Sequence, residues 1–329
     1  MLYYFCWTRS SSTSSSSLIR ILFVLLAVLG LDIPPTLGWL SPSSSCSSLS
    51  SPRVGIGTGT TSTTSSSTTT SLIPITMSSI GSPNDTADDS VRVLGVCGGI
   101  GSGKSTACKL LVSSCNCLVH IDADSVAHSV YAPGSQAVRD VVANFGRSEI
   151  AVGGDDGDGD DDDRPLEIDR KKLGAIVFAD RSKMAELEAI VWPHVRVALR
   201  KKIDRSKEEW KQNKNENGDD SASASRRPVV VLEAAVLLDA GWENMVDGVW
   251  AVTVPRKDAL QRLIETRGLT SEEATKRIDA QKSCRGIGNL SEEVENGVVT
   301  GVVVNDGSLE DLKQTLEKSL DDPSFWKQR

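Results

Sequence analysis

Residues 98–105 carry the clearest chemical signal in this sequence. They read Gly-Gly-Ile-Gly-Ser-Gly-Lys-Ser, which is the G-x-x-x-x-G-K-S pattern of a phosphate-binding loop. Glycines let consecutive backbone N–H groups turn toward a phosphate, and the N-terminus of a following helix adds positive potential. In such a loop Lys104 reaches the β- and γ-phosphates of a nucleotide, and the Ser105 hydroxyl binds Mg²⁺. The predicted nucleotide-binding residues are Gly98, Gly99, Ile100, Gly101, Ser102, Gly103, Lys104, Ser105 and Thr106.

The segments on either side of this loop have the periodicity that it requires. The apolar run 91–96 predicts a strand, and Ala107, Leu110 and Leu111 follow the loop at helical spacing. The alternative is a glycine-rich turn that binds nothing, but the complete motif between a strand and a helix favours the phosphate-binding loop. The sequence therefore predicts nucleotide binding, and the loop alone does not name a reaction.

Two aspartates follow the next predicted strand. Residues 117–121 have the composition of a short strand, and Asp122-Ala123-Asp124 closes it. If the strand continues, residues two apart place both carboxylates on one face, and that end of a parallel strand opens onto the nucleotide cleft. The alternative is a turn or a helix cap, for which Asp is equally suited. The spacing leaves both interpretations open.

A cluster of cations lies near a predicted helix in the C-terminal third of the chain. Thr270-Ser271-Glu272-Glu273 is a capping box that opens a helix running to about Ser283. A phosphoryl-transfer enzyme needs cations around the γ-phosphate and must exclude water, and a hinged helical lid with arginines supplies both. The alternative is an ordinary solvated helix face. The cations are Arg262, Arg267, Arg277, Lys282 and Arg285.

The remaining pattern alternates strands with helices. Long crossovers of this kind predict an α/β fold with a parallel sheet covered by helices on both faces. Further strands are expected at 228–232, 249–254 and 302–304. Helices are expected over 125–145 with a break at Pro133-Gly134, over 167–202 with an interruption at Pro193, over 257–266 and over 308–320, and a mobile charged loop over 207–227.

Composition limits the partners of the chain. Its 329 residues carry a formal net charge of −8, which argues against nucleic acid as the main partner. Seven cysteines are scattered without metal-ligand spacing, so they are interpreted as reduced thiols or small core residues. The Asp-rich run 153–163 is interpreted as a solvated insertion.

The first 88 residues differ from the rest and are interpreted as targeting sequence. Residues 1–38 resemble a signal peptide, with an unbroken apolar run of only eleven residues from Ile21 to Leu31, and no stable membrane span is expected in the mature form. Residues 39–88 are Ser/Thr-rich and resemble a transit peptide or a disordered segment. We expect an organelle location: a plastid through a bipartite presequence, a mitochondrion or the endoplasmic reticulum. A start at Met77 would give a cytoplasmic form, and the folded domain is expected over 89–329.

From about Val91 to Leu320 the chain resembles the dephospho-CoA kinase family. The loop 98–106 has the family's typical sequence, and the Asp-Ala-Asp segment matches its carboxylate strand end. Residues 234–242 look most like the kinase portion of the animal bifunctional CoA synthase. Trp192-Pro193 stands where the family commonly has His-Pro, which leaves no counterpart for that histidine side chain. Further matches are His128, the Pro133-Gly134 turn, and the segments 168–174, 177–178 and 305–308.

The resemblance implies a P-loop NTPase fold of the nucleoside-monophosphate-kinase type, with a helical substrate-binding insertion and a helical lid. It implies transfer of the γ-phosphate of ATP, with Mg²⁺, to the ribose 3′-hydroxyl of the small-molecule substrate dephospho-CoA. By the family match Asp124 is the candidate base, and Lys104 follows the charge that develops on the β/γ bridge. The match also assigns Asp122 to Mg²⁺ through water and to the substrate, His128 and Arg170 to the substrate, and Arg267 to the γ-phosphate.

Two other classes of protein share the loop. One is another P-loop small-molecule kinase, such as a nucleotide or shikimate kinase. Only acceptor preference separates such an enzyme from a dephospho-CoA kinase. The other is a nucleotide-binding regulator without kinase activity, although the chain has no Asn-Lys-x-Asp guanine-reading motif.

Overall fold

The computed structural model describes residues 91–152, 165–217 and 226–327. The predicted leader 1–38, the segment 39–88 and the Asp-rich run 153–163 lie outside these residues. Within them, no helix is both long enough and apolar enough to cross a membrane.

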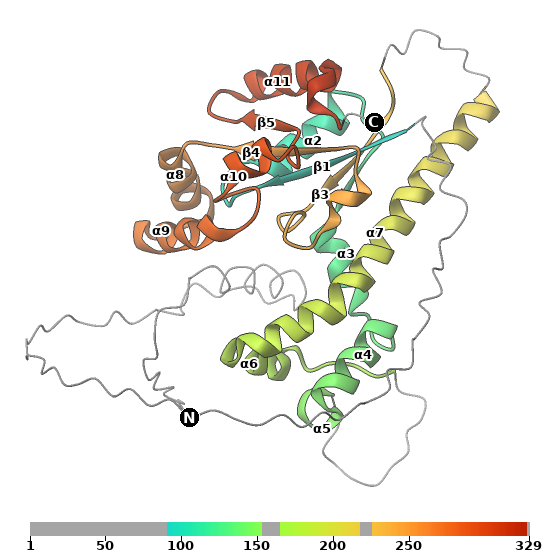
Figure 1. The fold of residues 1–329 in the computed structure, drawn as a ribbon, viewed down its shortest axis with the longest axis vertical. Helices are drawn as coiled ribbons and strands as arrows, with labels where there is room; N and C mark the ends of the chain where they lie inside the picture. The colour runs from blue at the N-terminus through green and yellow to red at the C-terminus, as the bar shows by residue number, and fades with distance from the viewer. Residues whose placement is uncertain (1–90, 153–164, 218–225, 328–329) are drawn as a thin grey trace, which may run out of the picture. The chain divides into compact units, whose positions relative to one another are not determined.

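The described residues form one five-stranded parallel sheet (Figure 1). The order β2-β3-β1-β4-β5 places β1, the strand that leads into the phosphate-binding loop, at the centre. The predicted parallel sheet is confirmed, with strand boundaries shifted by one or two residues. The strands are β1 (Arg92–Gly98), β2 (Val119–Asp122), β3 (Val229–Glu233), β4 (Gly248–Thr253) and β5 (Gly301–Val304).

Helices cover both faces of the sheet, as the alternating pattern predicted. On one face lie α2 (Lys104–Ser113) and α11 (Leu309–Asp321), which pack on β1 through Leu94 and Val96. On the other face Val93 and Cys97 of β1 pack in the core shared with α3 (Ala123–Val130) and α7 (Arg181–Asn217). Alternate residues of a buried strand thus contribute to two separate cores.

A group of helices between β2 and β3 forms the predicted insertion. The predicted break at Pro133-Gly134 is confirmed, because α3 ends at Val130 and the next helix begins at Gln136. Residues 133–135 between the two carry the turn, with Gly134 at a φ of +74°. The helices after α3 are α4 (Gln136–Phe145), α5 (Arg147–Ile150), α6 (Arg170–Ala179) and α7 (Arg181–Asn217).

The predicted interruption at Pro193 is wrong. Helix α7 runs through Pro193 without a break, although an interior proline costs a helix about 3 kcal/mol. Side chains spaced four residues apart are buried on both sides of it, and each stabilises the helix by roughly 1.5–3 kcal/mol, so packing outweighs the proline. They are Leu187, Val191, Val195 and Leu199.

The mobile loop predicted over 207–227 is wrong for its first half, where α7 continues to Asn217. This stretch is rich in Lys and Glu, which are good helix formers, and an Arg205–Glu209 pair at 2.7 Å adds i,i+4 support just before it.

A helical hairpin follows β4 and contains the predicted capping box. Helices α8 (Arg256–Arg267) and α9 (Ser271–Ala280) are joined at Gly268, whose φ of +63° suits glycine. Thr270 and Glu273 cap α9 reciprocally, which confirms the box, but the helix ends three residues before Ser283. The chain then continues through η2 (Gln281–Ser283) and α10 (Leu290–Glu295) to β5. Short 3₁₀ turns also occur at η1 (Trp242–Met245) and η3 (Pro323–Phe325).

Candidate active site

The predicted phosphate-binding loop joins β1 to α2 as expected. Gly101 and Gly103 have φ values of +75° and +87°, a region that other residues rarely adopt. A Cβ at Gly103 would also lie 2.2 Å from Asn305 Nδ2, so that position has no room for a side chain. Gly103 provides no side-chain cap for α2, and the first N–H groups of the helix therefore remain available to an anion.

Two residues from distant parts of the chain support this loop from beneath. Arg262 of α8 donates from Nη2 to the Asn305 carbonyl at 2.8 Å and from Nη1 to the Gly101 carbonyl at 3.4 Å. Asn305, which follows β5 and is buried, donates from Nδ2 to the Ser102 carbonyl at 2.8 Å. Arg262 and Asn305 thereby hold the carbonyls of Gly101 and Ser102 in place from two different elements.

A third tie connects the loop to the end of α9. Gln281 is buried, and its Oε1 accepts a hydrogen bond of 2.7 Å from the Ile100 N–H. The helical hairpin is thus bonded to the loop at two separated points, Arg262 and Gln281.

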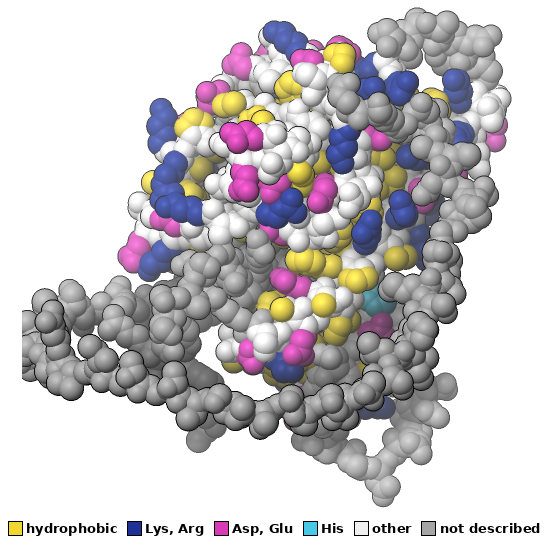
Figure 2. All heavy atoms as spheres, in the orientation of Figure 1, with side chains coloured by type: hydrophobic (Ala, Val, Ile, Leu, Met, Phe, Trp, Pro, Cys, Tyr) yellow, Lys and Arg dark blue, Asp and Glu magenta, His cyan; other side chains and the backbone are white. Residues whose placement is uncertain are grey.

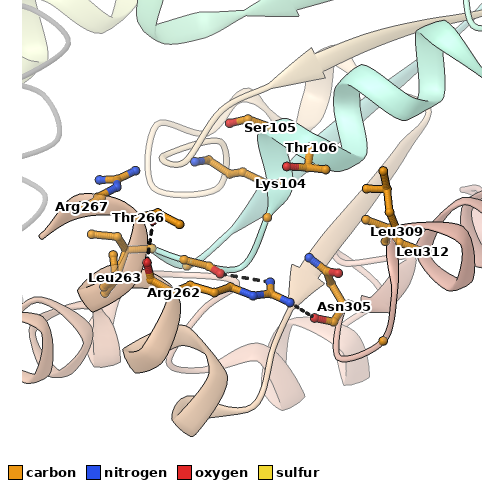
Figure 3. A pocket seen from close by; sticks show the side chains of 15 residues that line it. Lys104, Ser105, Thr106, Arg262, Leu263, Thr266, Arg267, Asn305, Leu309 and Leu312 are labelled. Atoms are coloured by element: carbon orange, nitrogen blue, oxygen red, sulfur yellow. Dashed lines mark hydrogen bonds between the residues drawn. The ribbon is translucent and has the colours of Figure 1, made fainter.

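An open pocket lies against the loop and runs between α8 and the start of α11 (Figure 3). The side chains of Lys104, Ser105 and Thr106 line one side of it. The remainder of the lining is mixed, with apolar side chains beside the cations Arg262 and Arg267. Arg267 is the last residue of α8, and its predicted role requires this position at the pocket. The apolar lining residues are Ile100, Leu263, Leu309 and Leu312.

A buried carboxylate at the end of β3 faces the loop. Glu233 Oε1 accepts a hydrogen bond from Ser105 Oγ at 2.5 Å and lies 3.5 Å from Lys104 Nζ. Its Oε2 lies 2.9 Å from His120 Nε2. Burial alone would raise the pKa of Glu233, but the hydrogen bonds with His120 and Ser105 and the charge of Lys104 outweigh burial and lower it. Glu233 is therefore ionised, and with the Ser105 hydroxyl it forms the all-oxygen donor set that Mg²⁺ prefers.

The two predicted aspartates adopt the helix-cap arrangement, not the extended one. Asp122 is the N-cap of α3, and its two oxygens accept from the Asp124 N–H at 3.0 Å and from Ser125 Oγ at 2.7 Å. Asp124 lies in the first turn of α3 and is half-buried. Asp122 and Glu233 are paired across β2 and β3, so all three carboxylates lie at the edge of the sheet that bears the loop.

Asp124 has the perturbed acidity of a functional carboxyl group. Burial, and next the neighbouring Asp122 charge, raise its pKa to about 6, with Lys104 opposing this shift and Glu233 adding to it. A carboxylate that is half ionised near pH 6 can accept a proton efficiently near neutral pH.

His128 and Arg170, both predicted to bind the substrate, come together across α3 and α6. Arg170 Nη1 lies 3.2 Å from His128 Nδ1, and both side chains reach the surface of the helical insertion. Nearby, Tyr131 is buried with its hydroxyl unpartnered among the residues that the structure describes. Trp192, at the position of the family's histidine, is partly buried and packs on the core.

Most of the predicted lid cations have structural partners. Figure 2 shows Lys and Arg side chains over α8 and α9 with Asp and Glu among them. Arg285 forms a bidentate pair with the buried Glu293 at 2.7 and 3.0 Å, and Lys282 lies 3.0 Å from Asp279. Of the five predicted cations, Arg262 and Arg267 line the pocket.

Four residues of this site were not predicted from the sequence: His120, Glu233, Gln281 and Asn305. A signal existed for Glu233, because it directly follows the apolar run 228–232, and an acidic residue at the carboxyl end of a parallel strand is where ligands bind. Gln281 and Asn305 carry no comparable signal, since each acts through a contact with a loop more than 180 residues away.

Comparisons with known proteins agree with one another. A family model described as dephospho-CoA kinase matches residues 92–311. The dephospho-CoA kinase of Geobacter sulfurreducens is 33% identical over 228 residues, which cover 69% of this chain and 96% of that protein. The enzyme of that name from Bacillus licheniformis is 34% identical over 229 residues, covering 70% of this chain and 95% of that one. The one from Symbiobacterium thermophilum is 32% identical over 227 residues, covering 69% and 79%.

Proposed function

This chain belongs to the dephospho-CoA kinase family, and we propose that it transfers the γ-phosphate of ATP to the ribose 3′-hydroxyl of dephospho-CoA. The products are CoA and ADP, and the reaction is the last step of coenzyme A synthesis. The observation that carries the proposal beyond family membership is the half-buried Asp124 carboxyl, with a pKa raised to about 6, at the same sheet edge as the phosphate-binding loop.

Phosphoryl transfer of this kind depends mainly on positioning and on stabilising charge. We assign the loop N–H groups and Lys104 to the β- and γ-phosphates, and Arg267 to the γ-phosphate from the opposite wall of the pocket. Asp124 accepts the proton of the ribose hydroxyl or orients that hydroxyl for attack. His128 and Arg170 bind the substrate on the side of the helical insertion.

Mg²⁺ fits the donors at the loop, because Ser105 and Glu233 offer a hydroxyl and a carboxylate within one hydrogen bond of each other. Ser105 and Glu233 would hold the ion, and Asp122 would act on it through water, since both its oxygens already cap α3. When bound, the ion neutralises charge on the β- and γ-phosphates.

The reaction is tested by offering separate acceptors with ATP and Mg²⁺ to the chain from Asp89 onward. Dephospho-CoA, AMP, adenosine and shikimate are compared by following ADP release and CoA formation. Turnover on dephospho-CoA alone is expected. Turnover on AMP or shikimate in place of dephospho-CoA would reject the assigned acceptor but not the fold. Nucleotide binding without turnover on any acceptor would favour a regulator without kinase activity.

Turnover is expected to depend on pH through Asp124. A base acts only when deprotonated, and the pKa of this carboxyl is raised to about 6. The value of kcat/KM for dephospho-CoA therefore falls about tenfold per pH unit below pH 6 and levels off above about pH 7. The profile of kcat/KM against pH reports the free enzyme and measures this directly, and a value that is flat from pH 5 to 8 would exclude Asp124 as the base.

Glu233→Gln is expected to raise the Mg²⁺ concentration for half-maximal activity by roughly 10–100-fold, because it removes the charged oxygen ligand proposed for the ion and the acceptor that orients Ser105. The glutamine amide has no charge to pair with Lys104, and it is a weaker acceptor for Ser105 Oγ than the carboxylate. Titration of activity with Mg²⁺ at fixed ATP measures the shift. Glu216→Gln, an exposed residue near the end of α7, is the matched control and should leave the titration unchanged.

We also propose that residues 1–88 direct the enzyme to an organelle, with the plastid, mitochondrion and endoplasmic reticulum as the candidate destinations. Support comes from the short apolar run 21–31 and the Ser/Thr-rich composition of 39–88. A fluorescent protein fused after residue 88 should leave the cytoplasm, whereas a fusion that starts at Met77 should stay there. Cytoplasmic fluorescence from both would reject the targeting role.

A further inference from the structure

Three side chains with metal-binding atoms converge behind the phosphate-binding loop. Cys108 comes from α2, His120 from β2 and Glu233 from β3, and their ligand atoms all lie within 4.8 Å of one another. Cys108 is fully buried and Glu233 nearly so, whereas the His120 side chain is 21% exposed. Glu233 lies 113 residues beyond His120 in the chain and the cluster holds a single cysteine, so cysteine spacing in the sequence does not indicate it.

We propose that Cys108, His120 and Glu233 form a binding site for a zinc-type divalent cation, separate from the Mg²⁺ ligands on the Ser105 side of Glu233. One sulfur, one imidazole nitrogen and one carboxylate oxygen are the donor set that zinc prefers, while Mg²⁺ takes oxygen ligands. Three protein ligands leave a fourth tetrahedral position for water, so the bound ion would be exchangeable.

The proposed site requires only a small contraction. Ligand atoms around tetrahedral zinc lie about 3.5 Å apart, given metal–ligand distances of about 2.0–2.3 Å. The His120 Nε2–Glu233 Oε2 separation is 2.9 Å and no pair of the three ligand atoms is more than 4.8 Å apart, so the ligands need to shift by only about 1 Å to reach this spacing.

Protons must leave when the cation binds. Burial, and next the Glu233 charge, raise the pKa of the Cys108 thiol well above its usual value, so this thiol keeps its proton in the metal-free protein. Zinc displaces that proton to solvent and binds the resulting thiolate. His120 donates from Nε2 to the Glu233 carboxylate in the metal-free protein, so Nε2 must also give up its proton, and the ring then carries its one proton on Nδ1 while Nε2 binds the ion.

Occupancy has a consequence for the reaction, and this part rests on the proposed function. Glu233 would be shared between the zinc-type cation and the pair formed by Ser105 and Lys104. The cation would withdraw negative charge from the carboxylate and weaken its hold on the Ser105 hydroxyl. Zinc should therefore inhibit turnover at Mg²⁺ concentrations that otherwise support it.

Binding is tested on the full chain with Co²⁺, a spectroscopic substitute for zinc. Wild-type protein should show a thiolate-to-cobalt charge-transfer band in the near ultraviolet that added Zn²⁺ removes. Cys108→Ser should lose the band, while Cys115→Ser, which alters another buried cysteine near the other end of α2, should keep it. A band unchanged in Cys108→Ser, or no band in wild type, would overturn the site.

His120→Gln provides a second variant should Cys108→Ser prove unstable. The amide can keep a hydrogen bond to Glu233, but it is a poor zinc ligand, so Co²⁺ affinity measured by titrating the band should fall roughly 10–100-fold. Unchanged affinity would exclude His120 as a ligand and reject the three-residue site.

Inhibition is measured separately, as the Zn²⁺ concentration that halves turnover with Mg²⁺ and ATP held fixed. That concentration should rise at least tenfold in Cys108→Ser and stay the same in Cys115→Ser. If the cobalt band behaves as expected but zinc inhibits Cys108→Ser as strongly as wild type, the inhibitory role is rejected and the site stands. If wild type does not phosphorylate dephospho-CoA, the proposed function fails, and the spectra still decide the site.

Discussion

Lys104→Ala is expected to lower kcat by roughly 10²–10³, because one preorganised electrostatic contact to a transferring phosphoryl group contributes about that much. The Lys104 ammonium is anchored at 3.5 Å from Glu233 Oε1, and its side chain is only 17% exposed. In the proposed reaction the ammonium thus approaches the phosphates from a fixed position, and a water molecule in its place would carry no charge. Steady-state turnover with saturating ATP and dephospho-CoA measures the loss.

The matched control for this variant is Lys109→Ala, which removes an exposed lysine five residues further along α2. It should turn over at the wild-type rate, since its side chain points to solvent. Lys104→Ala with near-native kcat would reject the role of the loop in catalysis. If the melting temperature of Lys104→Ala also fell well below that of the wild type, the lower rate would instead indicate a structural defect.

Asp124→Asn is expected to lower kcat by about 10²-fold while the affinity for ATP is retained. The amide keeps the shape of the side chain but cannot accept the hydroxyl proton. Isothermal titration with a nonhydrolysable ATP analogue, alongside turnover, separates binding from chemistry. Loss of ATP affinity with turnover preserved at saturation would make Asp124 a metal-site residue and not the base.

Asp124→Asn also has an expected effect on stability, and its direction is opposite to the effect on rate. The pKa of the carboxyl is raised to about 6 in the folded protein from an ordinary value near 3.8. Between those values the folded state binds more protons than the unfolded state, so Asp124 makes the fold less stable as pH rises through this window. The variant should accordingly melt at or above the wild-type temperature at pH 7, which distinguishes a lost base from a misfolded site.

The central part of the site was predictable because its signals are local. The strand, the glycine loop and α2 lie next to one another in the chain, and Gly98, Gly101 and Gly103 adopt positive φ values that favour glycine. The orientation of Asp122 and Asp124 was not predictable from spacing. Burial of Ala123, Val126 and Ala127 on one face settles it in favour of a helix, which is a property of the packed fold.

The parts that local rules missed depend on contacts across the chain. Proline normally ends a helix, yet the buried side chains on both sides of Pro193 keep α7 continuous. Asn305 is essential to the shape of the loop only because β5 ends beneath it, and Gln281 only because η2 returns to Ile100. No periodicity or spacing in the sequence predicts either contact.

The two bonds that tie the α8–α9 hairpin to the loop also bear on how long ADP stays bound. Arg262 lies within α8 and Gln281 at the C-terminal end of α9, so each helix of the hairpin has its own bond to the loop region, and Gly268 lies between them. Each hydrogen bond contributes about 0.5–1.5 kcal/mol, which is small enough to break within a catalytic cycle. Product release often limits turnover in enzymes with helical lids, so we expect Gln281, which bonds to the loop backbone, to influence how long ADP stays bound.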